Sequence, residues 1–386
     1  MTNKPLKLFI SVGEESADLH ASILIRELRS ILPNVEWYGF GGENMRQAGV
    51  RIIYPLPELA VTGFVEVIKK LPAIRHVTTL AVKSWEEEKP DAILLVDYPG
   101  LNLRLAKWAH QQKIPVYYYI APQAWAWKEK RAHLMRNVLK HLMVIFPFEE
   151  RFFQEYGIPT TFVGHPLTQT LPHRTSYPTN EELTREPIIG LLPGSRRTEL
   201  NNILPVMLNA AVEVREKIPR ARFVFPLAQS LPENTVNEFT IPPWVEVCRD
   251  PDYQRRLAMT FAWTSSGTAT VENALLGLPM AVVYRSNWVN VMIGRWLIRV
   301  PYIGMVNLIA QKGICPEFIQ EQCHPRQLAR YAVGLLQNPV RYREMVDDLQ
   351  SIRWKLSPIQ NQRSAAETLA QQLQWLLTHV TQATTQ

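Results

Sequence analysis

The feature that most constrains the fold of this sequence is an alternation of short apolar runs with helical patterns. Between the first two runs, apolar residues recur at helical spacing, as at Ala21, Ile25 and Leu28. Strands that alternate with helices form a mostly parallel sheet with helices on both faces, so the first half predicts a Rossmann-like domain. Its strands are expected in the β-branched or aromatic runs at 6–12, 35–42, 92–98 and 116–122.

The same alternation begins again at residue 188, after a break. Residues 168–187 are polar, contain three prolines and show no clear period, which predicts an interdomain linker. We therefore predict an α/β protein with two Rossmann-like parallel-sheet domains, at 1–167 and 188–337. Ligands of open α/β sheets bind beyond the carboxyl ends of the strands, so two such domains facing each other predict one cleft lined by loops from both. The strands of the second domain are expected in 188–196, 222–228, 261–267 and 279–285.

Composition excludes several classes of protein. The three cysteines, Cys248, Cys315 and Cys323, form no CxxC pair, so neither a disulfide framework nor a metal site is expected. The N-terminus resembles neither a signal peptide nor an anchor, and no apolar run approaches the ~20 residues that span a bilayer, which predicts a cytoplasmic protein. The net charge of +7 favours phosphates or an anionic membrane surface, and the scattered Lys and Arg residues argue against nucleic acid.

Two loops in the second half have the chemistry of a phosphate site. In "LLPGSRRTEL" (191–200), Ser195 is able to cap the helix that follows, and Arg196 adds a cation where backbone N–H groups already point outward. An ordinary capped helix with two solvated arginines explains this loop about equally well.

The second loop, "TSSGTATVENALLG" (264–277), repeats that geometry. Ser266, Gly267 and Thr268 form a small turn rich in hydrogen-bond donors, and the carboxylate of Glu272 is able to accept two bonds from a ribose diol. The alternative is an N-cap with an exposed Glu272. Because two phosphate-type helix starts occur in one half, we favour a nucleoside diphosphate site.

The first half offers complementary chemistry. The loop "GEESADLH" (13–20) has a single glycine followed by Glu14, Glu15 and Asp18, and these carboxylates would repel a phosphate but suit sugar hydroxyls. Asp97 ends a predicted strand and is a candidate general base for an attacking hydroxyl. Capping of the next helix is an equally weighted alternative for Asp97.

Two stretches predict contact with acyl chains or a membrane surface, because each combines apolar residues with Lys or Arg. Amphipathic helices packed on their own domains are the alternative. In 61–77 and 287–305, the candidate apolar contacts are Phe64, Val65, Ile68, Leu71, Trp288 and Trp296.

Motifs in order along nearly the whole chain resemble the lipid-A-disaccharide synthase family of glycosyltransferase-B enzymes. Three positions of the first loop depart from the family's usual "GEASGDLHG", namely Glu15, Ala17 and Ala21, and Val306 replaces a usual proline. The matching motifs are "GEESADLHA" (13–21), "YGFGGENM" (38–45), "ELAVTGFVEV" (58–67), "VDYPGLNLRLAK" (96–107), "YYIAPQAWAW" (118–127), "FPFE" (146–149), "FVGHPL" (162–167), "LPGSRRTEL" (192–200), "SSGTATVENALLGLPM" (265–280) and "PEFIQ" (316–320).

The resemblance implies an inverting transfer that needs no metal and no cofactor. UDP-2,3-diacylglucosamine would donate its sugar to the 6-hydroxyl of 2,3-diacylglucosamine 1-phosphate, at the cytoplasmic face of the inner membrane. Asp97 stands at the family's proposed base, and Glu15, Ser16 and Asp18 stand on the catalytic side. The donor side comprises Ser195, Arg196, Glu199, Ser266, Gly267, Thr268, Glu272, Asn307, Glu317 and Gln320.

The resemblance also implies that helices in 338–386 cross back to the first domain, and a homodimer is one expected assembly, because dimers that exchange this region occur in the family. Two other functions stay open at this stage. One is a UDP-sugar epimerase or hydrolase of the same fold, and the other is a non-catalytic nucleotide-binding protein of the membrane surface.

Overall fold

A computed structural model describes residues 5–55, 71–127, 130–286, 300–358 and 364–383. The chain forms two compact units. Unit 1 comprises residues 1–166 and 356–386, and unit 2 comprises residues 167–355. Each unit contains its own parallel sheet with helices on both faces, so the predicted fold class is confirmed.

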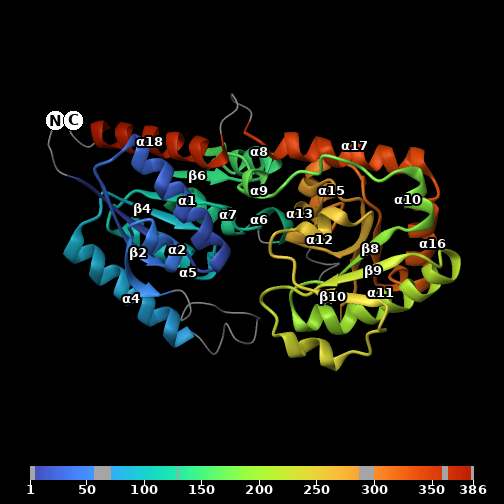
Figure 1. The fold of residues 1–386 in the computed structure, drawn as a ribbon. Helices are drawn as coiled ribbons and strands as arrows, with labels where there is room; N and C mark the ends of the chain where they lie inside the picture. The colour runs from blue at the N-terminus through green and yellow to red at the C-terminus, as the bar shows by residue number, and fades with distance from the viewer. Residues whose placement is uncertain (1–4, 56–70, 128–129, 287–299, 359–363, 384–386) are drawn as a thin grey trace. The chain divides into compact units, whose positions relative to one another are not determined.

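Unit 1 contains a seven-stranded sheet in the order β3-β2-β1-β4-β5-β6-β7 (Figure 1). Its strands are β1 (Leu6–Ser11), β2 (Val35–Gly41), β3 (Arg51–Pro55), β4 (Ala92–Val96), β5 (Val116–Tyr119), β6 (His141–Val144) and β7 (Thr160–Phe162). Its helices are α1 (Glu15–Ile31), α2 (Glu43–Gln47), α4 (Leu71–Glu88), α5 (Pro99–Gln111), α6 (Ala124–Trp127), α7 (Lys130–Val138), α8 (Pro147–Glu155) and α18 (Ala365–Ala383).

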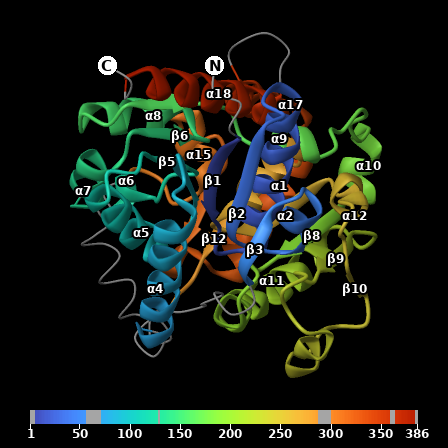
Figure 2. The ribbon, with the colours of Figure 1, turned by 90° about the vertical axis from the view of Figure 1, so that its left-hand side faces the viewer.

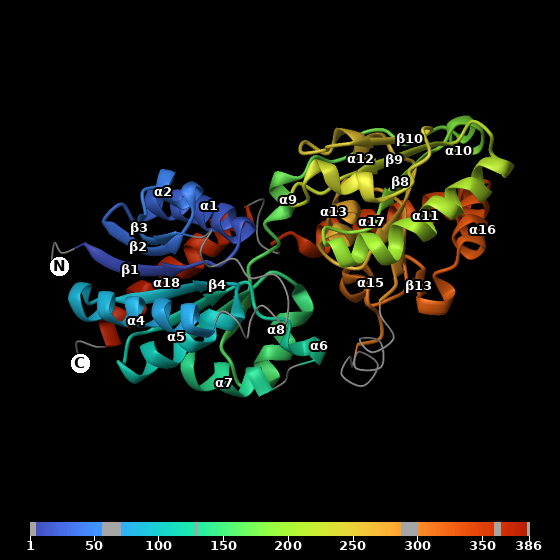
Figure 3. The same cartoon turned by 90° about the horizontal axis from the view of Figure 1, so that it is seen from below.

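The helices of unit 1 divide between the two faces of the sheet. The chain passes from β1 to β2 in one direction and from β4 to β5 in the other, and right-handed crossovers therefore place α1 and α5 on opposite faces. Figure 3 shows α1 and α2 on one side of the strands and α4, α5 and α7 on the other. Alternate residues of each strand fill the two cores, as Phe9 does on the α4 and α5 side, where it meets Trp85 edge to face.

The C-terminal helix α18 belongs to unit 1 and packs against α1 (Figure 2). The hydroxyl of Tyr117 on β5 donates to the carbonyl of Leu376 at 3.4 Å, and Gln374 donates to the carbonyl of Ile31 at the end of α1. Leu369 and Leu373, which belong to α18, have buried side chains. The last helix thus completes the core on the α1 face.

Unit 2 contains a six-stranded sheet in the order β10-β9-β8-β11-β12-β13. Its strands are β8 (Ile188–Leu192), β9 (Arg222–Pro226), β10 (Val245–Cys248), β11 (Phe261–Ser265), β12 (Met280–Tyr284) and β13 (Glu317–Ile319). Its helices are α9 (Leu167–Thr170), α10 (Asn180–Arg185), α11 (Arg197–Lys217), η2 (Glu233–Glu238), α12 (Gln254–Ala258), α13 (Thr268–Leu276), α15 (Met305–Ala310), η3 (Gln320–Gln322), α16 (Pro325–Leu336) and α17 (Pro339–Leu356).

Residues 168–187, which the sequence predicts to be a linker, are attached to unit 2 by buried side chains. Leu171 and Arg174 are each 5% exposed. Arg174 donates from Nη2 to the carbonyl of Met259 at 2.5 Å, and Arg353 on α17 donates to the carbonyls of Thr168 and Leu171. Charged side chains therefore fix this polar segment, although it lacks the apolar period that a sequence pattern would reveal.

Candidate active site

In unit 1 the topological switch point lies between β1 and β4, which are neighbours in the sheet. The loops that follow these two strands meet there. A Cβ atom added to Gly13 would lie 2.1 Å from Cγ of Tyr98, so only glycine permits this approach of the two loops. The sheet order thus brings the acidic loop after β1 to the Asp97 loop after β4, where open α/β sheets bind ligands.

Asp97 is held in a strained backbone conformation. Asp97 and Tyr98 have φ angles of 49° and 45°, which residues with a side chain rarely adopt. The N–H of Asp97 donates to the carbonyl of Tyr119, and its carbonyl accepts from Nδ2 of Asn102 at 2.8 Å and from the hydroxyl of Tyr118 at 2.5 Å. The surrounding bonds stabilise a turn that would otherwise relax.

The electrostatics of Asp97 suit a general base. Burial, and to a smaller extent the negative charge of Glu14, raise the pKa of the Asp97 carboxyl to about 6, while a hydrogen bond from the Tyr98 backbone opposes the shift. The carboxyl is then mostly ionised at neutral pH and has a higher proton affinity than a solvated aspartate. A base is most effective when its pKa lies near the pH at which it works, so a pKa of about 6 would suit a base near neutral pH.

Asn102 supports this turn from beneath. It is fully buried on α5, accepts from the Ser11 hydroxyl at 2.7 Å, and donates to the carbonyls of Val96 and Asp97 at 3.0 and 2.8 Å. Sequence reasoning missed Asn102, although its place in the motif "VDYPGLNLRLAK" (96–107) was a signal.

Replacing Asn102 with alanine should lower the free energy of unfolding by about 2 to 3 kcal/mol, because buried carbonyls and the Ser11 hydroxyl lose their partner. Urea denaturation measures the change, with Lys107→Ala on the exposed face of α5 as the control. Equal stability of Asn102→Ala and the parent protein would contradict this support role.

The other predicted residues of the first loop differ in their surroundings. Glu15 and Ser16 are exposed in the first turn of α1. Asp18 is 1% exposed, and its carboxylate accepts from the backbone N–H groups of Gly42 (2.7 Å) and Asn44 (3.0 Å) and from the Asn44 side chain. These bonds cap the start of α2, so they support a positioning role for Asp18.

A buried Trp–Glu pair lies in the same unit, and sequence reasoning gave it no role although both residues stand in quoted motifs. Glu149 is 1% exposed and accepts from the indole N–H of Trp125 at 2.9 Å and from the Phe146 N–H at 3.2 Å. Burial raises the pKa of Glu149 to about 8 against these hydrogen bonds, and the charge of Asp97 adds a smaller rise. The pair therefore belongs to the electrostatic environment of Asp97.

Replacing Glu149 with glutamine should change how stability depends on pH. The pKa of this carboxyl rises from 4.5 to about 8 on folding, so its stabilising contribution is complete below about pH 4.5 and is lost as the pH rises through about 8. The difference in unfolding free energy, parent minus variant, should therefore fall from about pH 5 to about pH 8. Urea denaturation across this range measures it, and a constant difference would show that Glu149 is ionised in the folded protein.

In unit 2 the switch point lies between β8 and β11, which pair in parallel. The loop after β8 is closed by Glu199, whose Oε2 accepts from the N–H groups of Ser195 (3.0 Å) and Arg196 (3.3 Å). Gly194 has a φ angle of +123°, and an added Cβ would lie 2.1 Å from the same oxygen. These contacts give Glu199 and Ser195 a part in shaping the turn at the start of α11.

Arg196 projects from this turn into solvent. Its side chain is 74% exposed, and Nη1 lies 3.1 Å from Oε1 of Glu199. An arginine beside a helix N-terminus is a good partner for a diphosphate, because its guanidinium and the backbone N–H groups attract the same negative charge.

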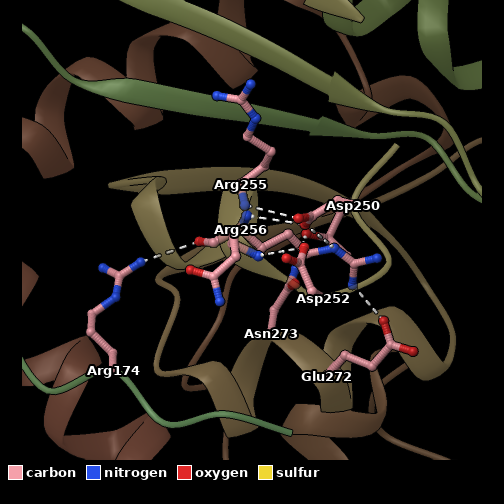
Figure 4. Close-up of polar contacts among 9 residues, drawn as sticks. Arg174, Asp250, Asp252, Arg255, Arg256, Glu272 and Asn273 are labelled. Atoms are coloured by element: carbon pink, nitrogen blue, oxygen red, sulfur yellow. Dashed lines mark hydrogen bonds and ion pairs between the residues drawn. The ribbon is translucent and has the colours of Figure 1, made fainter. Parts of the chain in front are cut away.

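The loop after β11 presents the second turn. Gly267 has a φ angle of +147°, and no atom of the described residues lies within 4 Å of an added Cβ, so its backbone is open to a close approach. Ser266 is half-buried and Thr268 is exposed at the start of α13. Further along this helix, Glu272 pairs with Arg256 of α12 at 2.5 Å (Figure 4).

Three further residues on the predicted donor side, Asn307, Glu317 and Gln320, hold the segments beside β12 and β13. The carboxylate of Glu317 accepts from the N–H groups of Ile303 and Gly304 and from Nδ2 of Asn307 at 2.8 Å. Gln320 makes two hydrogen bonds to the backbone of Ser286, at 2.8 and 3.1 Å. Asn307 is fully buried, so these contacts also support positioning roles.

Five of the predicted apolar contacts lie outside the described residues, namely Phe64, Val65, Ile68, Trp288 and Trp296. The sixth, Leu71, begins α4, but its side chain is not among those described. In the part of the chain that the structure describes, none of the helices combines the length and apolar character of a membrane crossing. Within the same ranges, no three His, Cys, Asp or Glu side chains gather as a metal site would need.

Solved structures resemble this fold at low sequence identity. The glycosyltransferase of kitacinnamycin matches with a TM-score of 0.64 and 15% identity, over 97% of this chain and all of that one. CalG4, the calicheamicin glycosyltransferase, matches at 0.60 and 14%, over 98% of this chain and all of its own. A putative UDP-N-acetylglucosamine 2-epimerase from Listeria monocytogenes matches at 0.63 and 13%, over 94% of each chain.

Sequence comparison is more specific than the fold. The family model described as lipid-A-disaccharide synthetase matches residues 8–373. Lipid-A-disaccharide synthase 1 of Legionella pneumophila (strain Lens) and the lipid-A-disaccharide synthase of Nitrosococcus oceani are each 37% identical to this chain, over 92% of it and 94% of their own length. With both switch points inside the matched region, the chain belongs to the lipid-A-disaccharide synthase family.

Proposed function

We propose that this protein is a lipid-A-disaccharide synthase that condenses UDP-2,3-diacylglucosamine with 2,3-diacylglucosamine 1-phosphate. The products would be UDP and the β-1,6-linked tetraacyl disaccharide 1-phosphate. The observation that carries the proposal is the 37% identity to enzymes of this name over 92% of the chain. The chemistry of the two switch points is consistent with it.

In the proposed reaction, Asp97 accepts the proton of the acceptor's 6-hydroxyl as that oxygen forms a bond to the anomeric carbon of the donor. The bond between this carbon and the diphosphate oxygen breaks, and UDP leaves with the electron pair. Attack opposite to the leaving group inverts the anomeric centre. The raised pKa of Asp97 supports its place as the base.

The diphosphate would be bound in unit 2. Arg196 and the 266–268 turn offer positive donors, which stabilise the charge that develops on the leaving group. Such donors would stabilise this charge without a metal ion.

We also propose that the protein works as a peripheral protein at the cytoplasmic face of the inner membrane. The proposed substrates carry acyl chains, and the sequence of 61–77 and 287–305 combines apolar residues with Lys and Arg. Sedimentation with vesicles rich in anionic phospholipid tests this, and binding that weakens with salt is expected.

The proposed assembly is a homodimer. This proposal rests only on the resemblance to the family, and light scattering, which measures the mass of the particle in solution, tests it.

Release of UDP from UDP-2,3-diacylglucosamine, measured with and without 2,3-diacylglucosamine 1-phosphate, tests the proposed function. Release that depends on the acceptor, together with the disaccharide in mass spectrometry, is the expected result. Release at the same rate without acceptor would instead identify a hydrolase. Binding of UDP with no turnover of either lipid would identify a nucleotide-binding protein.

A further inference from the structure

The carboxylate proposed to bind ribose already has a partner within unit 2. Nη1 of Arg256 lies 2.5 Å from Oε2 of Glu272, and the two side chains are 17% and 20% exposed (Figure 4). Oε1 of Glu272 has no partner among the described residues, and Figure 4 shows it pointing away from Arg256. One oxygen of the carboxylate is therefore fixed while the other stays available.

Arg256 is itself held on several sides. Its Nε lies 3.6 Å from the buried carboxylate of Asp250, and its guanidinium lies over the ring of Tyr253, 4.8 Å from the centroid. Its backbone carbonyl also accepts from Nη2 of Arg174 at 3.3 Å. A guanidinium with this many contacts loses little further freedom when a ligand binds, so the direction of the Glu272 carboxylate is set in advance.

Arg256 also offsets part of the negative charge of Glu272. Asp250 accepts from the N–H groups of Arg255 and Arg256 at 2.8 and 3.1 Å, so the start of α12 meets its negative charge. Because Nε of Arg256 also lies 3.6 Å from Asp250, the guanidinium is shared between two carboxylates and offsets the charge of Glu272 in part. An unpaired carboxylate one helical turn after the 266–268 turn would repel a diphosphate bound there.

We infer that Arg256 is a positioning residue of the nucleotide site, which orients Glu272 so that its free oxygen accepts a hydrogen bond from a ribose hydroxyl. The inference rests on the proposed function and adds a residue that does not touch the ligand. It predicts that Arg256 controls recognition of the ribose hydroxyls rather than affinity for the diphosphate alone.

The test compares the Kd of UDP with that of 2′,3′-dideoxy-UDP, measured by calorimetry. The parent protein should prefer UDP by roughly 10- to 100-fold, as expected for a hydrogen bond to a charged group. In Arg256→Gln this preference should fall to within about threefold, and Glu272→Gln should lose it to the same extent. The double variant should lose no more, because both changes remove one interaction.

Arg255→Gln is the matched control. This neighbour points away from Glu272 in Figure 4 and pairs with Glu246 at 2.9 Å on the surface, so its loss should leave the preference intact. If Arg256→Gln does not fold, Arg256→Lys replaces it. That variant keeps the charge but not the planar fork, and an intermediate preference is expected.

Three results would overturn the inference. An Arg256→Gln protein with a lower urea midpoint but an unchanged preference would show a purely structural role. A parent protein that binds UDP without any preference would remove the role of Glu272 as well. A parent protein that binds neither nucleotide would overturn the proposed function itself, and the inference with it.

Discussion

Replacing Asp97 with asparagine is expected to reduce acceptor-dependent UDP release by about 10²- to 10⁴-fold, the usual contribution of a general base. Asparagine keeps the shape of the side chain and the backbone bonds to Asn102 and Tyr118, but it accepts no proton. The affinity for UDP should not change, because Asp97 lies in unit 1 and the residues proposed to bind the diphosphate lie in unit 2. The measurement is the rate of UDP release with acceptor present, beside the Kd of UDP.

The same assignment predicts a pH profile. Because burial and Glu14 raise the pKa of Asp97 to about 6, the carboxyl is protonated and inactive as a base below this value. The value of kcat/KM should therefore rise as the pH increases through about 6 and then level off. Replacing Glu14 with glutamine should lower the midpoint, since one source of negative charge is removed.

The matched control for Asp97→Asn is Asp91→Asn. Asp91 is an exposed residue immediately before β4, and its carboxylate accepts from the N–H of Lys7 at 2.8 Å. It precedes the same strand that Asp97 follows, so the pair of variants separates an effect at the carboxyl end of β4 from a general effect of lost charge. Full activity in Asp97→Asn would contradict the assignment of the base.

Replacing Arg196 with glutamine is expected to lower kcat/KM by about 10²- to 10³-fold, the size of effect seen when a donor to a developing negative charge is removed. Its side chain is 74% exposed and pairs with Glu199 in its own turn, so its loss should cost little stability. Steady-state kinetics with UDP-2,3-diacylglucosamine, together with a urea denaturation curve, separate the chemical effect from the structural one.

Arg197→Gln is the control for this experiment. Arg197 is the next residue, is similarly exposed at 63%, and pairs with Glu238 of η2. Arg197→Gln should keep most of the activity, because Glu238 pairs with the Arg197 guanidinium away from the turn after β8. Equal losses in the two variants would show that net charge, and not the position of Arg196, determines binding of the diphosphate.

Much of the fold, and the choice of loops for the candidate site, followed from local patterns in the sequence. The apolar runs predicted the main strands of both sheets, and the helical spacing of Ala21, Ile25 and Leu28 predicted α1. Strands β3, β6, β7, β10 and β13 were not predicted, because runs of three to five residues are too short to show a clear period. Candidate site residues were predicted in the loops after β1, β4, β8 and β11, because polar residues follow an apolar run at each of these places.

The partner of each side chain could not be predicted in this way. Asp18 was expected on the catalytic side, and only the structure shows that its carboxylate accepts from backbone N–H groups of residues 42–45. Glu272 was expected to be a free acceptor, but Arg256, 16 residues earlier in the chain, occupies one of its oxygens. In both cases the partner comes from another element, and its approach depends on how helices pack around the sheet.

The sequence by itself therefore determined the two parallel sheets, the family and the loops of the candidate site. These properties depend on residue type and on spacing within one element, which can be read along the chain. Only the tertiary structure decided that β1 and β4 are neighbours, that Asp97 lies in a strained turn where Glu14 raises its pKa, and that Arg256 pairs with Glu272. Strand order and helix packing join residues that are distant in sequence, and both burial and charge at a site depend on those long-range contacts.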